Sequence, residues 1–189
     1  MKDANDREAD VLLVTRAADF AARAHVMHRR KGNLQEPYLN HLAEVAILLA
    51  EATDGRDAVL IAAGWLHDTL EDTDTEREEL EKYFGREIAA IVAEVTDDKS
   101  LPRSERKRLQ IERAPSKSVK ARLLKIADKT SNVRALAKSP PMGWRRERSE
   151  EYVSWAEAVV AGCRGLNIHL EKEFDAAVLD ARAVLGASR

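Results

Sequence analysis

The sequence predicts an all-α protein, and three observations support that prediction. Apolar residues recur at helical spacing along most of the chain, and no stretch shows the alternation of a half-buried strand. Charged residues make up 34% of the 189 residues, while aromatic residues are 5% and there are only 8 Gly and 5 Pro. That composition is typical of helical proteins and argues against a β-sandwich or barrel. No repeat, low-complexity tract or linker divides the chain, so we expect a single-domain helical bundle.

The first half of the chain is predicted to contain five helices. Their apolar residues lie three and four positions apart, and Gly or Pro residues separate several of them. Thr75 and Glu78 form a capping box, with Thr75 as the N-cap of the fourth helix. The predicted helices run, in order, from Val11 to about Arg30, from near Asn40 to the break at Gly55, from about Arg56 through Leu66, from Thr75 to Gly85, and along Ile88 to Val95. His67 and Asp68 are predicted to lie inside the third of them.

The second half is predicted to contain four helical segments. A loop at residues 99–102 precedes a basic segment, 103–113, which ends before Pro115. The next helix carries the apolar residues of 119–133 and is stopped by Pro140 and Pro141. The last two run over about 143–163 and 167–185.

Composition excludes several classes of function. The 31 Lys and Arg against 33 Asp and Glu give a net charge of −2, which removes the electrostatic case for a general nucleic-acid binder. The single cysteine, Cys163, excludes an intramolecular disulfide framework and a thiolate zinc cluster. No apolar run reaches the ~18 residues of a membrane span. We therefore expect a cytoplasmic protein without nucleic-acid or membrane partners, and the small net charge leaves homo-oligomerisation open.

Four ionisable residues gather near the end of the apolar third helix. Glu71 lies four residues after His67 and three after Asp68, so it shares their face, and Asp72 lies four after Asp68. Carboxylates at a helix C-terminus oppose the helix dipole, and a bound cation would explain three of them there. The alternative is a group of solvated acids.

Two distant residues extend this group. His41 shares the apolar face of the second helix with Val45 and Leu48, where the alternative is a core histidine. Asp128 interrupts an apolar helix, where the alternative is a salt bridge to a neighbouring lysine, and Asn132 follows it four residues later. Two imidazoles and two carboxylates suit Mn²⁺, Fe²⁺, Co²⁺ or Zn²⁺ better than Ca²⁺.

The order of these motifs resembles the HD-domain metal-dependent phosphohydrolases. Longer strings make the chain similar to the RelA/SpoT-type hydrolase domain in its stand-alone form. These strings are Arg29-Arg30-Lys31, Pro37-Tyr38-Leu39-Asn40-His41, Leu66-His67-Asp68-Thr69-Leu70-Glu71-Asp72-Thr73, Phe84-Gly85, Val95-Thr96-Asp97-Asp98-Lys99 and Ala127-Asp128-Lys129. The resemblance implies one all-helical HD domain over residues 1–189, with a core at about 16–170.

The resemblance also implies an activity and a set of site residues. The activity is Mn²⁺-dependent hydrolysis of guanosine 3′-diphosphate 5′-di- or triphosphate (ppGpp or pppGpp) to GDP or GTP and pyrophosphate. The positions that match the family are His41, His67, Asp68 and Asp128 for the metal, Glu71, Asp72 and Asn132 for catalysis, and Arg30, Lys31, Lys99, Arg148 and Tyr152 for the substrate.

Two other functions stay open at this stage. One is hydrolysis of another nucleotide, such as ppApp or the 2′-phosphate of NADPH. The other is a nucleotide-binding module without hydrolysis, although the intact pair of Glu71 and Asp72 argues against a pure sensor. The chain departs from the family at Thr130-Ser131, where Leu-Tyr is common. This departure removes an aromatic residue near the site and concerns base or ribose contacts rather than the metal.

Overall fold

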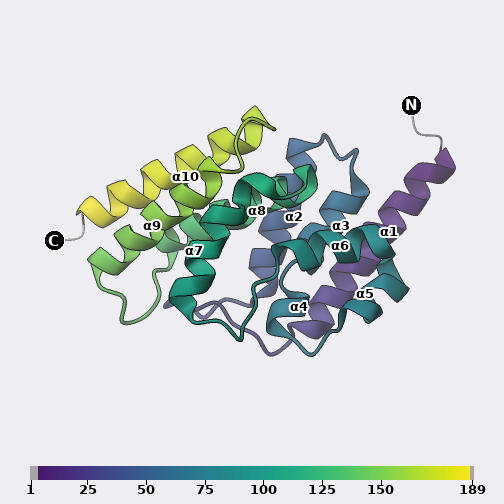
Figure 1. The fold of residues 1–189 in the computed structure, drawn as a ribbon, viewed down its shortest axis with the longest axis horizontal. Helices are drawn as coiled ribbons and strands as arrows, with labels where there is room; N and C mark the ends of the chain where they lie inside the picture. The colour runs from purple at the N-terminus through teal and green to yellow at the C-terminus, as the bar shows by residue number, and fades with distance from the viewer. Residues whose placement is uncertain (1–3, 188–189) are drawn as a thin grey trace.

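A computed structural model describes residues 4–187, which form helices joined by loops (Figure 1). Within that range there is no strand, only two isolated bridges, and the all-α prediction is confirmed. The helices are α1 (Ala4–Ala24), α2 (Leu39–Ala52), α3 (Ala58–Leu66), α4 (Thr69–Asp72), α5 (Arg77–Phe84), α6 (Arg86–Val95), α7 (Arg103–Arg113), the short 3₁₀ helix η1 (Ala114–Ser116), α8 (Val119–Lys138), α9 (Arg146–Ala161) and α10 (Ile168–Ala187).

Helix α8 is the centre of the fold. Helices α2, α3, α6, α9 and α10 all pack against it, and Figure 1 shows it between the two ends of the molecule. Its residues 123–131 are buried without interruption, so this stretch is covered on every side. Five of them are polar and need partners inside the protein. They are Lys125, Asp128, Lys129, Thr130 and Ser131.

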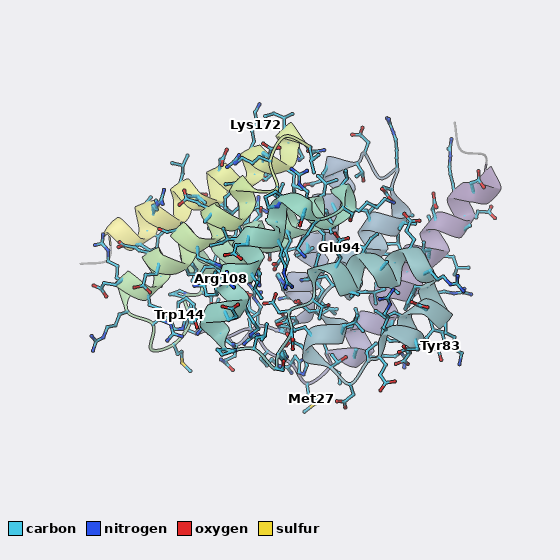
Figure 2. All side chains as sticks on the ribbon, viewed as in Figure 1. Met27, Tyr83, Glu94, Arg108, Trp144 and Lys172 are labelled. Atoms are coloured by element: carbon cyan, nitrogen blue, oxygen red, sulfur yellow. The ribbon has the colours of Figure 1, made fainter. Side chains whose placement is uncertain are left out.

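Other helices pack against one another around α8. Helices α1, α2 and α3 pack together, and α5 packs against α6. Helix α10 lies along α8, with Phe174 fully buried between them and neighbouring helices. Charged side chains such as that of Lys172 project outward, as Figure 2 shows. None of the helices in residues 4–187 has both the length and the apolar character that crossing a membrane requires.

The first helix ends at Ala24, so the prediction that it reaches about Arg30 was wrong. The backbone after it forms hydrogen bonds with the segment before α2. Tyr38 N donates to the His28 carbonyl at 3.0 Å, and Arg30 N donates to the Glu36 carbonyl at 2.8 Å. These bonds replace the helical ones, and they place Arg30 in a loop beside the start of α2.

The third helix also ends earlier than predicted, at Leu66, and α4 begins at Thr69. His67 and Asp68 therefore lie at the junction of two helices rather than inside one. The Thr69 hydroxyl donates to the Leu66 carbonyl at 2.6 Å, which satisfies an acceptor at the end of α3. The junction turns the chain, so the relation of Glu71 to His67 is not that of a continuous helix.

The predicted capping box was wrong as well. Helix α5 begins at Arg77, and its N-cap residue Glu76 makes no side-chain cap bond. Thr75 instead contacts Thr73: the Thr73 hydroxyl lies 2.8 Å from Thr75 Oγ1 and accepts from Thr75 N at 3.2 Å. A local threonine pair thus competes successfully with the cap.

The loop that carries Arg30 and Lys31 is anchored to the end of α8. The Ser139 hydroxyl accepts from Leu34 N at 3.1 Å and donates to Asn33 Oδ1 at 2.7 Å. Gly32 pairs with Pro141, and a β-carbon on Gly32 would lie 2.2 Å from Ser139 Oγ and 2.4 Å from the Ser139 carbonyl oxygen. Only glycine allows this close approach of the two segments.

We therefore predict that Gly32→Ala destabilises the protein by about 1–3 kcal/mol, because the added methyl group overpacks a fixed backbone contact. Urea unfolding monitored by circular dichroism measures this change. Gly186→Ala is the matched control, since a β-carbon there would meet nothing within 4 Å. An unchanged unfolding midpoint for Gly32→Ala would show that the loop is not held against Ser139.

Candidate active site

A cavity of about 500 Å³ lies between the loop at residues 29–32, the start of α2, α8 and the start of α9. Six of the twelve predicted site residues line it: Arg30, Lys31, His41, Asp72, Asn132 and Tyr152. Cationic side chains outnumber acidic ones in its wall. The cations are Arg29, Arg30, Lys31, Arg103, Arg134 and Lys138, against Glu36, Glu44 and Asp72. Such a wall favours a polyanionic ligand.

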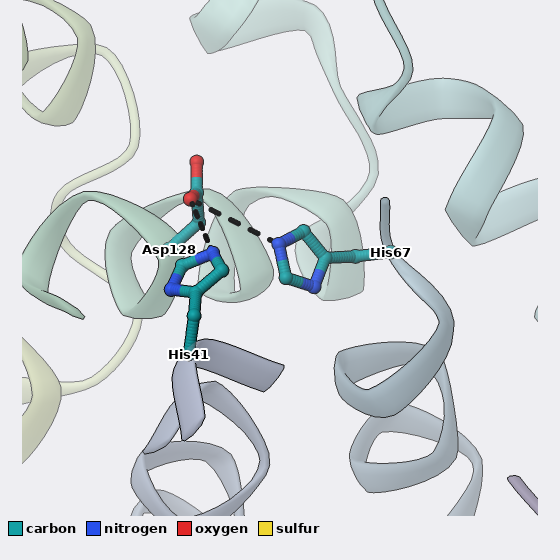
Figure 3. Close-up of side chains that lie close together, drawn as sticks. All are labelled: His41, His67 and Asp128. Atoms are coloured by element: carbon teal, nitrogen blue, oxygen red, sulfur yellow. Dashed lines mark ion pairs between the residues drawn. The ribbon is translucent and has the colours of Figure 1, made fainter. Parts of the chain in front are cut away.

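Three buried side chains from separate segments of the chain converge beside this cavity (Figure 3). One ligand atom each from His41, His67 and Asp128 lies within 4.8 Å of the others. His41 Nε2 is 3.5 Å from Asp128 Oδ1, and His67 Nε2 is 3.9 Å from the same oxygen. Helix α2 carries His41, the α3–α4 junction carries His67, and α8 carries Asp128, so helix packing brings the three together.

Asp68 completes the predicted four-residue set. Its Oδ2 lies 3.0 Å from His67 Nε2 and 3.6 Å from His41 Nε2. The Tyr38 hydroxyl donates to the same oxygen at 2.6 Å. Burial and the negative charge of Asp68 raise the pKa of Tyr38 well above its usual value, so this hydroxyl keeps its proton. Tyr38, three residues before His41, is a site residue that the sequence did not predict.

Both imidazoles present an unpartnered nitrogen to these carboxylates. The two Nε2 atoms are buried and, among the described residues, form no hydrogen bond. Their Nδ1 atoms are engaged: that of His67 donates to the Gly64 carbonyl at 2.8 Å, and that of His41 lies 2.8 Å from Ser131 Oγ. Two imidazole lone pairs and two carboxylates facing one point require positive charge. The set therefore fits a divalent cation held by His41, His67, Asp68 and Asp128.

The pKa values of His67 and Asp68 also indicate that the site requires positive charge. Burial lowers the pKa of His67, but the negative charges of Asp68 and Asp128 outweigh it and raise the value to about 9. Burial raises the pKa of Asp68, but His67 and His41 lower it by more, so the pKa lies well below its ordinary range. In the absence of a cation, a proton on His67 balances the carboxylates.

Asp128 is held from two sides on α8. Lys129 Nζ donates to its Oδ2 at 2.9 Å, and Asn132 Nδ2 donates to its Oδ1 at 2.5 Å. Burial opposes the charge on Asp128, but Lys129 and the two histidines keep its pKa well below the ordinary value. The salt bridge considered as an alternative at Asp128 therefore exists, and it coexists with the histidine cluster.

The acidic pair Glu71 and Asp72 lies on α4. Glu71 Oε2 accepts from Asp97 N at 3.2 Å, and its Oε1 is 3.7 Å from Arg106 Nη1. Burial raises the pKa of Glu71; the Asp97 N–H lowers it, and the charges of Asp97, Asp68 and Asp72 raise it further. Asp72 pairs with Lys99, whose Nζ lies 2.6 Å from Asp72 Oδ1. Lys99 thus contacts Asp72 and is not among the residues that line the cavity.

The remaining substrate candidates lie at different distances from the cavity. Arg30 Nη1 donates to Asn132 Oδ1 at 3.2 Å, which ties the loop to α8. The pKa of Tyr152 is raised by burial. Arg148 is exposed, with its guanidinium 4.5 Å from the centre of the Trp144 ring, and it does not line the cavity. Trp144 does, so Arg148 touches the wall from outside.

Comparisons with known proteins agree with this geometry. The HD domain family matches residues 17–161. The guanosine-3′,5′-bis(diphosphate) 3′-pyrophosphohydrolase MESH1 of Xenopus tropicalis is 47% identical over 172 residues, covering 91% of this chain and 96% of the relative. The Homo sapiens MESH1 is 49% identical over 156 residues, covering 82% and 87%.

A solved structure is similar as well. That structure is of a metazoan ortholog of SpoT described as hydrolysing ppGpp and playing a role in starvation responses, and it superposes with a TM-score of 0.85 at 41% identity, covering 91% of this chain and 96% of that one. The chain therefore belongs to the HD-domain family, in the group that contains the MESH1 pyrophosphohydrolases.

Proposed function

We propose that this protein hydrolyses ppGpp and pppGpp at the 3′ position in a Mn²⁺-dependent reaction. Water attacks the 3′-pyrophosphate, the phosphorus–oxygen bond at the 3′ oxygen breaks, and GDP or GTP and pyrophosphate leave. One observation supports this most strongly: the two unpartnered Nε2 atoms lie with Asp68 and Asp128 beside a cavity walled by cations. The identity to relatives named for this activity supplies the substrate.

The metal ligands proposed are His41, His67, Asp68 and Asp128. A divalent ion bound there supplies a Lewis acid and lowers the pKa of a water molecule. Manganese is the ion that the family resemblance implies, and the mixed set of imidazole and carboxylate ligands without thiolate is compatible with it, as with Fe²⁺, Co²⁺ or Zn²⁺. Tyr38, Lys129 and Asn132 hold the two carboxylates in place through the hydrogen bonds described above.

Glu71 is proposed as the proton acceptor for the attacking water. Its pKa, raised mainly by burial, makes it a better base than an ordinary glutamate. Asp72 lines the cavity and is held by Lys99, so it is proposed to orient the water or substrate. Asn132 donates to Asp128 and accepts from Arg30, which leaves one Nδ2 proton for a substrate oxygen.

The substrate contacts are proposed along the cationic wall. Arg30 and Lys31 come from the loop anchored by Gly32, and Tyr152 faces the same cavity. An arginine can bind a phosphate through two N–H groups or stack on a purine, whereas a lysine acts as a point charge. Arg148 would reach the substrate only at the rim, and Lys99 acts through Asp72.

The proposal treats residues 1–189 as one HD domain, with its core at about 16–170. It places the protein in the cytoplasm, with the nucleotide as its partner and no nucleic acid or membrane. The proposed function is compatible with a homo-oligomer.

The first prediction concerns the metal. Protein stripped with a chelator should release no pyrophosphate from ppGpp until Mn²⁺ is added, and His67→Ala should lose at least ~100-fold, since even outer-shell changes can cost that much. The amount of pyrophosphate released from ppGpp measures both the Mn²⁺ dependence and the loss in His67→Ala. His169→Ala, at an exposed position on α10, is the matched control and should retain activity.

The outcome also tests the substrate. Metal-loaded, folded protein that leaves ppGpp intact would contradict the proposal. The same assay with ppApp and with NADPH would then show whether another nucleotide is cleaved, and calorimetry with ppGpp would show binding without turnover.

The second prediction concerns the base. Glu71→Gln keeps the size of the side chain but removes the proton acceptor, so kcat should fall about 10²–10⁴-fold. Steady-state kinetics at saturating Mn²⁺ measures this. Glu78→Gln, an exposed carboxylate on α5, should leave kcat unchanged. A Glu71→Gln variant with kcat near that of the wild type would exclude Glu71 as the base.

The third prediction concerns pH. A base must be ionised, so kcat/KM should fall with decreasing pH through the pKa of Glu71, above the ordinary range of a glutamate. Asp97→Asn removes a negative charge that raises this pKa and keeps the backbone N–H that lowers it. The acid limb of the kcat/KM profile should therefore move to lower pH in Asp97→Asn. An acid limb that stays at the same pH, or moves to higher pH, in Asp97→Asn would contradict the assignment of Glu71 as the base.

A further inference from the structure

A chain of hydrogen bonds leads from His41 away from the proposed metal position. His41 Nδ1 lies 2.8 Å from Ser131 Oγ, and both residues are buried. The Ser131 hydroxyl donates to Glu44 Oε2 at 2.7 Å. Glu44 Oε1 accepts from Arg134 Nη1 at 3.2 Å, and Arg134 also pairs with Glu173. The chain thus begins at a proposed metal ligand and ends on a network of ion pairs.

The carboxylate of Glu44 determines which atom donates and which accepts in each of these hydrogen bonds. A serine hydroxyl has one proton, and a carboxylate only accepts. Since Ser131 donates its proton to Glu44, its oxygen can only accept from His41, so Nδ1 carries the imidazole proton. In the neutral ring the other nitrogen, Nε2, then has the free lone pair. Nε2 is the atom that lies 3.6 Å from Asp68 Oδ2 and 3.5 Å from Asp128 Oδ1.

The same two helices supply the ligands and their supports. Glu44 lies three residues after His41 on α2, and Ser131 lies three residues after Asp128 on α8. Residues three apart share one face of a helix. The contact between α2 and α8 that brings His41 to Asp128 therefore also brings Glu44 to Ser131.

His67 obtains the same arrangement in another way. Its Nδ1 donates to the Gly64 backbone carbonyl at 2.8 Å, which also leaves Nε2 with the lone pair. A backbone carbonyl is present whatever the side chain at that position. The support of His41, in contrast, depends on two side chains and can be removed by substitution.

We propose that Ser131 and Glu44 are positioning residues for His41. They hold the imidazole in the tautomer with a proton on Nδ1, and they direct Nε2 toward the divalent cation. The inference rests on the proposed function in one respect, namely that His41 is a metal ligand. It gives a role to Ser131, one of the two positions at which the sequence departs from the family.

The test is Mn²⁺ binding to metal-free protein, measured by isothermal titration calorimetry. Ser131→Ala removes the hydrogen-bond acceptor that His41 Nδ1 has among the described residues, so the ring can take the wrong tautomer. Mn²⁺ affinity should fall about 10–100-fold, as for other outer-shell partners of histidine ligands. Pyrophosphate release should need correspondingly more Mn²⁺, while kcat at saturating Mn²⁺ should change much less.

Thr130→Val is the matched control. Thr130 is a neighbouring, fully buried residue whose hydroxyl donates to the Ile126 carbonyl of its own helix at 2.8 Å. It should lose stability without losing Mn²⁺ affinity. Thermal unfolding of metal-free protein compares the two variants, so that a general loss of structure is separated from a loss of metal binding.

Glu44→Gln tests whether the Ser131 hydroxyl must donate to a carboxylate. It is also the second variant to measure if Ser131→Ala does not fold. An amide can donate as well as accept, so the Ser131 proton could turn toward His41 and place the imidazole proton on Nε2. Mn²⁺ affinity should fall here too. Wild-type affinity in Ser131→Ala, or in Glu44→Gln, would overturn the inference and leave the proposed function intact. Absence of Mn²⁺ binding by the wild type would contradict both.

Discussion

The structure depends on one electrostatic constraint: two carboxylates and two imidazole nitrogens face each other in the interior. Asp68 and Asp128 lie within 3.9 Å of the unpartnered Nε2 atoms of His41 and His67. Without a positive charge between them, this arrangement would be strongly unfavourable in a low-dielectric interior. A proton on His67 or a divalent ion satisfies it. The packing of α2, the α3–α4 junction and α8 maintains the constraint.

The residues around this centre are arranged by charge. Each of the two inner carboxylates has a hydrogen-bond donor outside the histidine cluster: Tyr38 for Asp68, and Lys129 with Asn132 for Asp128. The outer acids Glu71 and Asp72 are placed beside Arg106 and Lys99. Beyond them, the cavity wall is mainly cationic. A nucleotide in this cavity would meet positive charge for its phosphates at the wall.

Much of the fold could be predicted because the apolar period is local. The basic helix at residues 103–113 was predicted with the bounds that α7 has, and the stop at Pro140 lies just beyond the end of α8. Errors arose where a helix end is decided by competing hydrogen bonds. Arg30 lies outside the first helix, and its N–H donates to the Glu36 carbonyl; Thr75 bonds to Thr73 and does not cap α5. The residue pattern alone does not say which of several nearby partners a polar group will take.

The sequence by itself determined the fold class, the family and the identity of the ionisable residues, because residue type and spacing follow directly from it. Only the tertiary structure decided which polar groups share a proton. Ser131 and Glu44 are 87 positions apart, and nothing local to either of them predicts their hydrogen bond. The turn at His67 and Asp68 was likewise decided by packing. A buried polar group must find its partner wherever the fold provides one, so its role becomes visible only when the helices are assembled.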